Sequence, residues 1–233
     1  MRPQKLRHLA PALLSLIILG LTYNVQAQSG YHPAQNFILP TPSPKVDYYS
    51  KFDGNPFFSE TSTKASIITN DGNQFNNISV KYDLVNDLIV SDQPANAEDI
   101  NPVIIKNVSS LMLKDVNNNV SYFESGFPAI DSFNEKTLYQ VMTNGSAKIL
   151  KKTYKAIVPR KVYGFQPVKE VVSSSKYYLY QNNKIIELRK NKSSLLAALP
   201  ENKSEINTYV ETNHLNLKSD KDVDAVLAYY NTL

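Results

Sequence analysis

The chain contains no cysteine, no tryptophan and only three histidines. The absence of cysteine excludes disulfides, thiolate metal ligands, cysteine nucleophiles and the lipidated cysteine of bacterial lipoproteins. Beyond the N-terminal segment only His32 and His214 remain, and no two histidines stand at metal-ligand spacing. A G-x-S-x-G motif is also missing. We therefore expect neither a histidine metal site nor a Ser-His-Asp triad.

Glycine is scarce, and its seven occurrences are scattered singly along the chain. This distribution excludes a glycine-rich phosphate loop. The stretch from Asp115 to Asn119 begins like a calcium-binding loop, but Val120 occupies the position of the turn glycine and Gly126 that of the bidentate glutamate. The sequence therefore predicts a hairpin turn there, with no metal site and no cofactor.

Residues 1–27 have the pattern of a Sec-type signal peptide. Arg2, Lys5 and Arg7 precede the apolar run 9–21, and small residues end the segment at Ala27. The apolar run is shorter than the roughly 20 residues that a membrane-spanning helix needs. We expect cleavage after Ala27 and export without a transmembrane span. The product would be periplasmic or associated with the outer membrane, or it would be secreted.

The segment that follows the signal peptide, residues 28–54, is rich in proline and poor in apolar residues that keep a period. Such composition favours an extended, poorly ordered leader over a strand or a helix. The sequence then predicts an antiparallel β domain over residues 55–190 and a helical unit over residues 191–233 that packs on it.

Basic residues are unevenly distributed. Three of the 25 lysines and arginines lie in the signal peptide, which leaves 22 against 21 acids in the mature chain. Residues 148–192 nevertheless hold 12 basic residues and two acids, interleaved with tyrosines. If these side chains face one way, they would attract an anionic envelope component. Nucleic acid is not an expected partner because the chain is exported. The alternative is a set of solvated strand exteriors. The candidate binding residues are Lys151, Lys152, Arg160, Lys161 and Tyr163.

Apolar and aromatic runs that alternate with polar residues end repeatedly at Asn, Asp or Gly pairs between residues 57 and 188. This pattern is typical of antiparallel hairpins, because asparagine tolerates the positive φ that tight turns require. The predicted turns lie at residues 71–72, 86–87, 117–118, 144–145 and 182–183. They indicate a mainly β protein, an antiparallel meander closed as a barrel or folded as a sandwich.

Two details of the first hairpins can be predicted. A two-residue loop at Asp71-Gly72 would pair Ile68 with Phe75. A bulge near residues 76–77 would then change the face toward which the later side chains of the second strand point. Alternation in the stretch NISVKYDLVNDLIV, residues 77–90, places Tyr82 and Asp83 on opposite faces. We expect Tyr82 in the core and Asp83 free to pair with Lys81 or with solvent.

The period changes to about 3.6 after Arg189. Ser193 and Ser194 would cap a helix that ends before Pro200, and a second helix would span residues 201–213. A third would start at Ser219, whose spacing to Asp222 resembles a capping box. Its apolar residues form a narrow stripe of Val223, Val226, Leu227 and Tyr230.

Two stretches carry a family resemblance. One is residues 76–90, where a strand ends in Lys81-Tyr82-Asp83 before a short turn, and the other is residues 190–233, which close with AYYN at 228–231. Here the chain resembles an uncharacterised family of exported proteins of Gram-negative bacteria that have a signal peptide, a mostly β body and a helical C-terminus. It departs from that pattern in its longer leader and at residues 93–95. The resemblance implies location and architecture, and it brings no catalytic or binding residues.

These observations predict an exported, non-catalytic binding or envelope-associated protein, not an enzyme. A hydrolase of envelope polymers that uses two carboxylates is one alternative, because two acids can meet from any two strands. A carrier of a lipid-like ligand inside a β-barrel is another.

Overall fold

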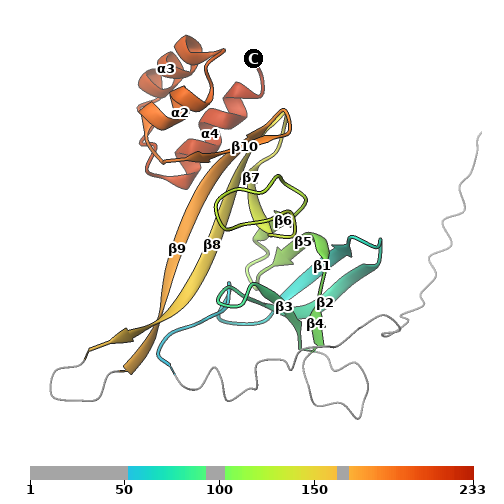
Figure 1. The fold of residues 1–233 in the computed structure, drawn as a ribbon. Helices are drawn as coiled ribbons and strands as arrows, with labels where there is room; N and C mark the ends of the chain where they lie inside the picture. The colour runs from blue at the N-terminus through green and yellow to red at the C-terminus, as the bar shows by residue number, and fades with distance from the viewer. Residues whose placement is uncertain (1–51, 93–102, 162–167) are drawn as a thin grey trace, which may run out of the picture. The chain divides into compact units, whose positions relative to one another are not determined.

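The computed structural model describes residues 52–92, 103–161 and 168–233, and all of them belong to one compact unit. They form one antiparallel sheet followed by three short helices (Figure 1). The predicted mainly β class with a C-terminal helical unit is confirmed. The predicted signal peptide, most of the predicted leader and Tyr163 lie outside the described residues.

Ten strands make the sheet. They are β1 Thr63–Thr69, β2 Gln74–Asp83, β3 Leu88–Ser91, β4 Val103–Ile105, β5 Val108–Lys114, β6 Val120–Glu124, β7 Tyr139–Thr143, β8 Ala147–Arg160, β9 Val168–Gln181 and β10 Lys184–Leu188. Their order is β10-β9-β8-β7-β6-β5-β1-β2-β3-β4. The described strands therefore form two meanders, β1–β4 and β5–β10, which meet where β5 pairs with β1. The order has two ends, so the sheet does not close on itself.

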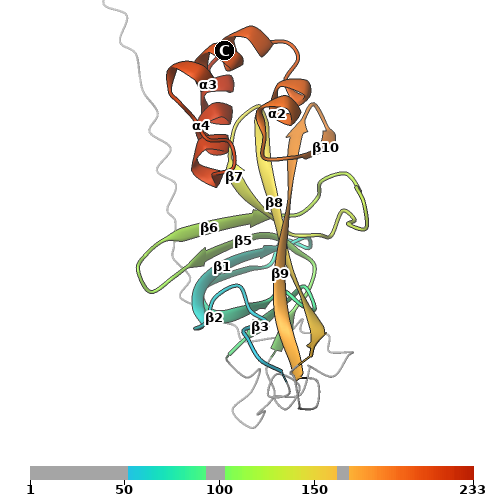
Figure 2. The same cartoon turned by 90° about the vertical axis from the view of Figure 1, so that its left-hand side faces the viewer.

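The first five strands coil around a core. β4 and β5 stand at opposite ends of the set β5-β1-β2-β3-β4, yet only Lys106 and Asn107 separate them in the chain. In a flat sheet they would lie about 19 Å apart, and the link spans at most about 11 Å. The coil that results buries Ile67, Val80 and Leu111 almost completely. Figure 2 shows these strands stacked across the long β8–β9 pair.

The first hairpin differs from its predicted register. Four residues, not two, separate β1 from β2, and Ile67 is the partner of Phe75. Ile67 is accordingly buried, whereas Ile68 is 42 % exposed. The predicted bulge is confirmed, because the register shifts between the pairs Ala65–Ile78 and Ile67–Phe75 and Asn77 adopts φ 55°. The loop length, which the Asp-Gly pair alone does not determine, explains the one-residue error.

The other predicted turns are in place. Asp87, Asn118, Asn182 and Asn183 all adopt positive φ, as does Gly145. Each of them lies between two neighbouring antiparallel strands of the sheet. The preference of Asn, Asp and Gly for this backbone region thus determines where the strands reverse.

The helices are α2 Lys192–Ala198, α3 Lys203–Thr212 and α4 Asp220–Tyr230. Asn191 caps α2 by accepting a hydrogen bond from the Ser194 amide, in place of the predicted serines. Ser219 is the N-cap of α4, but its side chain makes no capping bond, and Asp222 accepts the Asn216 amide. The predicted capping box is therefore not formed.

The helical unit packs on the sheet. The predicted apolar stripe of α4 is buried, and α4 contacts β7 and β8 while α2 contacts β10. Ile149 and Leu179 of the sheet join Leu199, Ile206 and Val226 in one core cluster. Among the described helices, none has the length and apolar character needed to cross a lipid bilayer.

Candidate functional site

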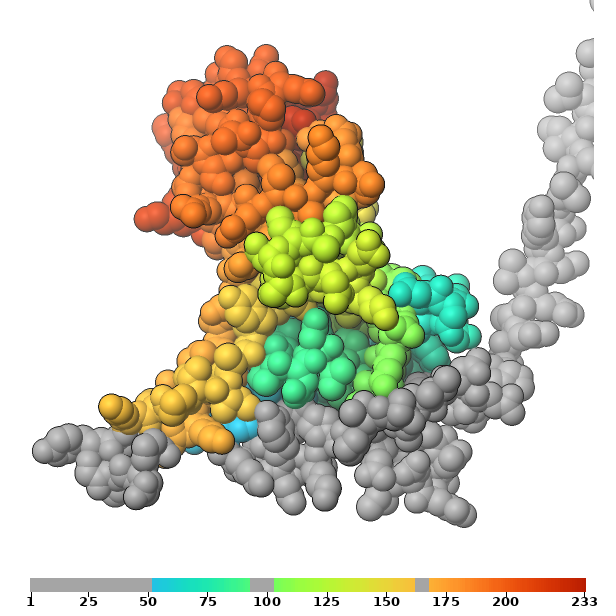
Figure 3. Space-filling model, viewed as in Figure 1, coloured from blue at the N-terminus to red at the C-terminus, as the bar shows by residue number. Residues whose placement is uncertain are grey.

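A groove of about 340 Å³ lies where three segments meet: the turn between β2 and β3, the loop between β6 and β7, and the β8–β9 pair. Figure 3 views a face on which these segments lie side by side, with the β6–β7 loop in yellow-green. The groove is lined by Leu84, Val85, Asp87, Ser132, Phe133, Lys152, Tyr154, Lys155 and Lys176. This mixture of apolar, aromatic and basic side chains suits a small amphiphilic ligand.

The β8–β9 pair supplies one wall through strand periodicity. Lys152 and Tyr154 are two residues apart on β8 and so share a face, and Lys176 of β9 lies directly opposite Lys152. Phe133 of the β6–β7 loop packs against Tyr154, with ring centroids 6.3 Å apart. Strand alternation therefore places Lys152, Tyr154 and Lys176 on the same face of the β8–β9 pair.

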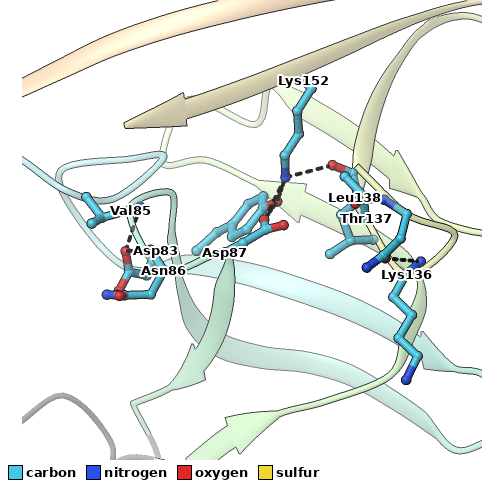
Figure 4. Close-up of polar contacts among 10 residues, drawn as sticks. Asp83, Val85, Asn86, Asp87, Lys136, Thr137, Leu138 and Lys152 are labelled. Atoms are coloured by element: carbon cyan, nitrogen blue, oxygen red, sulfur yellow. Dashed lines mark hydrogen bonds and ion pairs between the residues drawn. The ribbon is translucent and has the colours of Figure 1, made fainter. Parts of the chain in front are cut away.

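Lys152 lines the groove, and its side chain is only 4 % exposed. Figure 4 shows that it points toward Asp87 and Leu138. Its ammonium donates to Asp87 Oδ1 at 2.6 Å, to Leu138 O at 3.2 Å and to Tyr82 Oη at 3.2 Å. Tyr82 Oη in turn donates to Asp87 Oδ1 at 2.6 Å. The three protons of the ammonium therefore have three acceptors, as a buried lysine requires.

The environment shifts the pKa of both buried partners. Burial raises the pKa of Tyr82 well above that of an ordinary phenol, and the Asp87 charge and hydrogen bond raise it further. Burial lowers the pKa of Lys152, and Asp87 opposes that change. Asp87 thus stabilises the charged lysine and the neutral tyrosine, and it joins β8 to the β2–β3 turn.

The expectation for Asp83 is wrong, whereas that for Tyr82 is confirmed. Tyr82 is 2 % exposed in the core, on the opposite face from Asp83. Asp83 is also buried, and its carboxylate accepts the amides of Val85 and Asn86 and the Asn86 side chain. The turn that follows β2, and not solvent, supplies these hydrogen bonds to the buried carboxylate. Asp83 therefore fixes the turn that presents Asp87.

Lys155 has a different set of partners. Its ammonium donates to the carbonyl oxygens of Asn55 at 2.8 Å and Phe57 at 2.6 Å, and its amide donates to Leu84 O. In the described part of the chain it bonds no carboxylate. Burial lowers the pKa of its amine. Lys155 therefore brings a positive charge that no acid neutralises directly.

Lys176 is bound to the β6–β7 loop. Its ammonium lies 2.7 Å from Asp131 Oδ2, which also accepts a hydrogen bond from Tyr178 Oη at 2.9 Å. The Lys176 side chain is 35 % exposed. Counting Lys152, Lys155 and Lys176 against Asp87 and Asp131, the groove and the acids bound to it carry one excess positive charge.

The structure does not gather the predicted binding residues. Lys151 and Lys152 extend from opposite faces of β8, and Lys151 binds Asp220 of α4 at 2.7 Å. Arg160, at the far end of β8, binds Asp53 at 3.1 Å and Glu170 at 2.9 Å. Lys161 is exposed just beyond β8. Of the predicted residues within the described ranges, Lys152 alone lines the groove.

Sequence reasoning did not single out Asp87, Phe133, Lys155 or Lys176 as site residues. Lys155 and Lys176 belong to the basic segment, and the spacing of Lys152 and Tyr154 indicates a shared face. The contribution of Asp87 is not visible in the sequence because it is 65 residues from Lys152. The two acids at the groove each bind a lysine, and no cluster of three metal-ligating side chains occurs in residues 52–92, 103–161 and 168–233.

Comparison with protein-family models, with curated proteins and with solved structures finds no match for this chain.

Proposed function

We propose that this chain is an exported, non-catalytic binding protein whose groove receives the anionic group of an amphiphilic ligand. The observation that carries the proposal is the position of Lys155, a groove-lining lysine that bonds two backbone carbonyls and no carboxylate within the described ranges. Such a charge is available to an acid group that enters the groove. Lys176, one third exposed, adds a second cation at the same wall.

The apolar part of the ligand has a place beside these charges. Leu84, Val85, Phe133 and Tyr154 line the same groove. The volume of about 340 Å³ falls at the small end of the range for small-molecule sites. A ligand with one acidic group and one or two rings, or a short apolar chain, matches this lining. The lysines that line the groove would thus serve the anionic envelope component that the sequence suggests.

A pair of fluorescent dyes tests this proposal. Anilinonaphthalene sulfonate carries an aromatic body and one sulfonate, and N-phenylnaphthylamine has the same body without the charge. We expect the folded mature chain to bind the sulfonate more tightly than the neutral dye. Lys155→Gln and Lys176→Gln should each weaken the binding of the sulfonate several-fold and leave the neutral dye unchanged, because each removes a cation and keeps the apolar lining of the groove.

Lys184→Gln is the matched control, since Lys184 is exposed on β10 outside the groove. Circular dichroism of each variant separates a lost site from lost folding. Equal affinity of the wild-type chain for both dyes, or equal losses in Lys184→Gln and Lys155→Gln, would refute the anionic site.

A further inference from the structure

The outer edge of β9 has a gap between two segments of the same chain that pair with it. β10 pairs with β9 from Gln181 to Tyr177, and Asp53 forms a parallel bridge with Glu170. Between them, residues 172–175 are exposed. No described segment pairs with this part of the edge, although β8 pairs with its inner side throughout.

The backbone groups that face the gap can be identified. The amide of Val171 donates to Asp53 O, which lies outside the β8–β9 pair, so alternate residues Ser173 and Ser175 direct their amides and carbonyls the same way. The partner of Ser173 on β8 also indicates that the Ser173 amide and carbonyl point away from β8. Lys155 lies opposite Ser173 and sends its amide to Leu84 O, away from β9. Two N–H and two C=O groups thus form a row that no strand within the described ranges pairs with.

The gap lacks the usual protection of an edge strand. Natural sheets block their edges with proline, bulges or charged side chains. Here three consecutive small residues, Ser173, Ser174 and Ser175, occupy the gap, and the pairing with β8 runs through it without a bulge. These three serines therefore place no bulky side chain against a strand that approaches the row of backbone groups.

We propose that this edge binds an extended peptide segment of a partner protein by strand addition, with an acidic side chain beside Ser174. A row of alternating donors and acceptors with the two-residue repeat of a strand matches peptide backbone and not a lipid or a sugar. The residue that pairs with Ser174 would place its side chain on the face that carries Tyr154 and Lys176. The preference for acid rests on the proposed function of the groove, whereas the edge itself does not.

The structure also offers a specific way to close the edge. Proline at position 173 or 175 would remove an N–H that faces the gap, and it would keep the ladder to β8, because those amides point away from β8. Proline at position 174 would remove an amide that pairs with β8. Ser173→Pro and Ser175→Pro are therefore expected to fold, and Ser174→Ala is the matched control that leaves every backbone group in place.

The experiment selects nine-residue peptides from a phage-displayed random library on the mature chain, residues 28–233. We expect enriched peptides whose synthetic forms slow the hydrogen exchange of the Ser173 and Ser175 amides. Ser173→Pro and Ser175→Pro should weaken them at least tenfold, and Ser174→Ala should not. Methylation of alternate peptide nitrogens should abolish binding in one register only, because one set of amides faces β9.

Three results would overturn the proposal: no enriched peptide, peptides that bind Ser173→Pro as tightly as wild type, or self-association of the chain that Ser173→Pro abolishes while peptides fail to bind. The groove is tested separately by Lys176→Gln. Peptides that require the open edge but ignore this substitution would retain strand addition and reject the acidic preference. Loss of dye binding in that variant with unchanged peptide binding would assign the groove to another ligand.

Discussion

Lys151 Nζ of β8 lies 2.7 Å from Asp220 Oδ2 at the start of α4. The other oxygen of the same carboxylate accepts hydrogen bonds from Lys190 Nζ and Tyr177 Oη, both at 2.8 Å. One side chain of the last helix thus binds β8, β9 and the segment that follows β10. Asp220 also stands in the first turn of α4, where a negative charge is favourable.

Replacement of the Asp220 carboxylate should weaken the packing of the helical unit on the sheet. Asp220→Asn leaves Lys151 and Lys190 close together without a counter-charge, and we expect the free energy of unfolding to fall by about 1–3 kcal/mol. Urea denaturation measures the change. Glu201→Gln, at an exposed position before α3, should change stability by less than about 0.5 kcal/mol. Equal effects of the two substitutions would contradict a linking role for Asp220.

The same carboxylate predicts a pH dependence. Burial raises the pKa of Asp220, but hydrogen bonds from Lys151, Lys190 and Tyr177 outweigh it and lower the pKa to about 2. The unfolded chain, with a carboxyl pKa of about 4, binds more protons between these values, so stability rises with pH there. The contribution should be complete above about pH 4 and lost as the pH falls through 2. The stability difference between wild type and Asp220→Asn should therefore shrink from pH 5 to pH 2.

Asp87 and Lys152 should respond unequally to substitution. Asp87→Asn leaves a buried ammonium without its counter-charge, and we expect a loss of about 2–4 kcal/mol. Lys152→Met removes the buried charge and keeps much of the volume, while Asp87, 43 % exposed, remains hydrated. This variant should lose less, and adding it to Asp87→Asn should recover part of the stability. A double-mutant cycle by urea denaturation measures the coupling.

The pH profile of Asp87→Asn gives a second test. Burial lowers the pKa of Lys152. The unfolded chain therefore binds more protons than the folded chain as the pH approaches the pKa of an ordinary amine. Stability of the variant relative to wild type should rise as the pH is raised toward the pKa of an ordinary amine, because the unpaired lysine loses its charge. A deficit that stays constant up to pH 10 would show that the lysine is not the source of the loss.

Two buried tyrosines offer a matched pair. Tyr139 is completely buried, and its hydroxyl has no hydrogen-bond partner in the described residues. Tyr178 is equally buried, but its hydroxyl donates to Asp131 Oδ2 at 2.9 Å. Tyr139→Phe should be neutral or raise the melting temperature, because it removes an unsatisfied polar atom. Tyr178→Phe should lower it. The opposite order would mean that the Tyr139 hydroxyl has a partner in solution.

The sequence predicts local reversals well and the sheet order poorly. The expected turns form at Asn86-Asp87, Asn117-Asn118 and Asn182-Asn183. They are predictable because the tolerance of Asn and Asp for positive φ is intrinsic to these residue types and does not depend on distant contacts. The pairing of β1 with β5 is not predicted, since nothing in either strand encodes a partner 39 to 50 residues away. The register at Ile67 depends on the length of a loop, which its turn residues do not specify alone.

The site was predictable only in part. The sequence identifies Lys152 and its basic neighbourhood, and alternation places Lys152 and Tyr154 on one face. It does not distinguish Lys151, which binds α4, from Lys152, which lies in the core, because both are adjacent lysines on one strand. Which face the helices cover depends on the assembled sheet. The β9 gap is likewise invisible before the bounds of β10 and the Asp53 bridge are known.

The pairing of β1 with β5 has a consequence for the rate of folding. β8 and β9 are consecutive in the chain, and their paired residues lie 8 to 34 positions apart. In the β1–β5 pair, residue 64 lies opposite residue 114. This pair can therefore form only after the intervening strands have formed and curved. Such non-local pairing carries a loop-closure cost before any contact compensates for it. The β8–β9 hairpin should therefore acquire protection from hydrogen exchange before the β1–β5 pair that joins the two meanders.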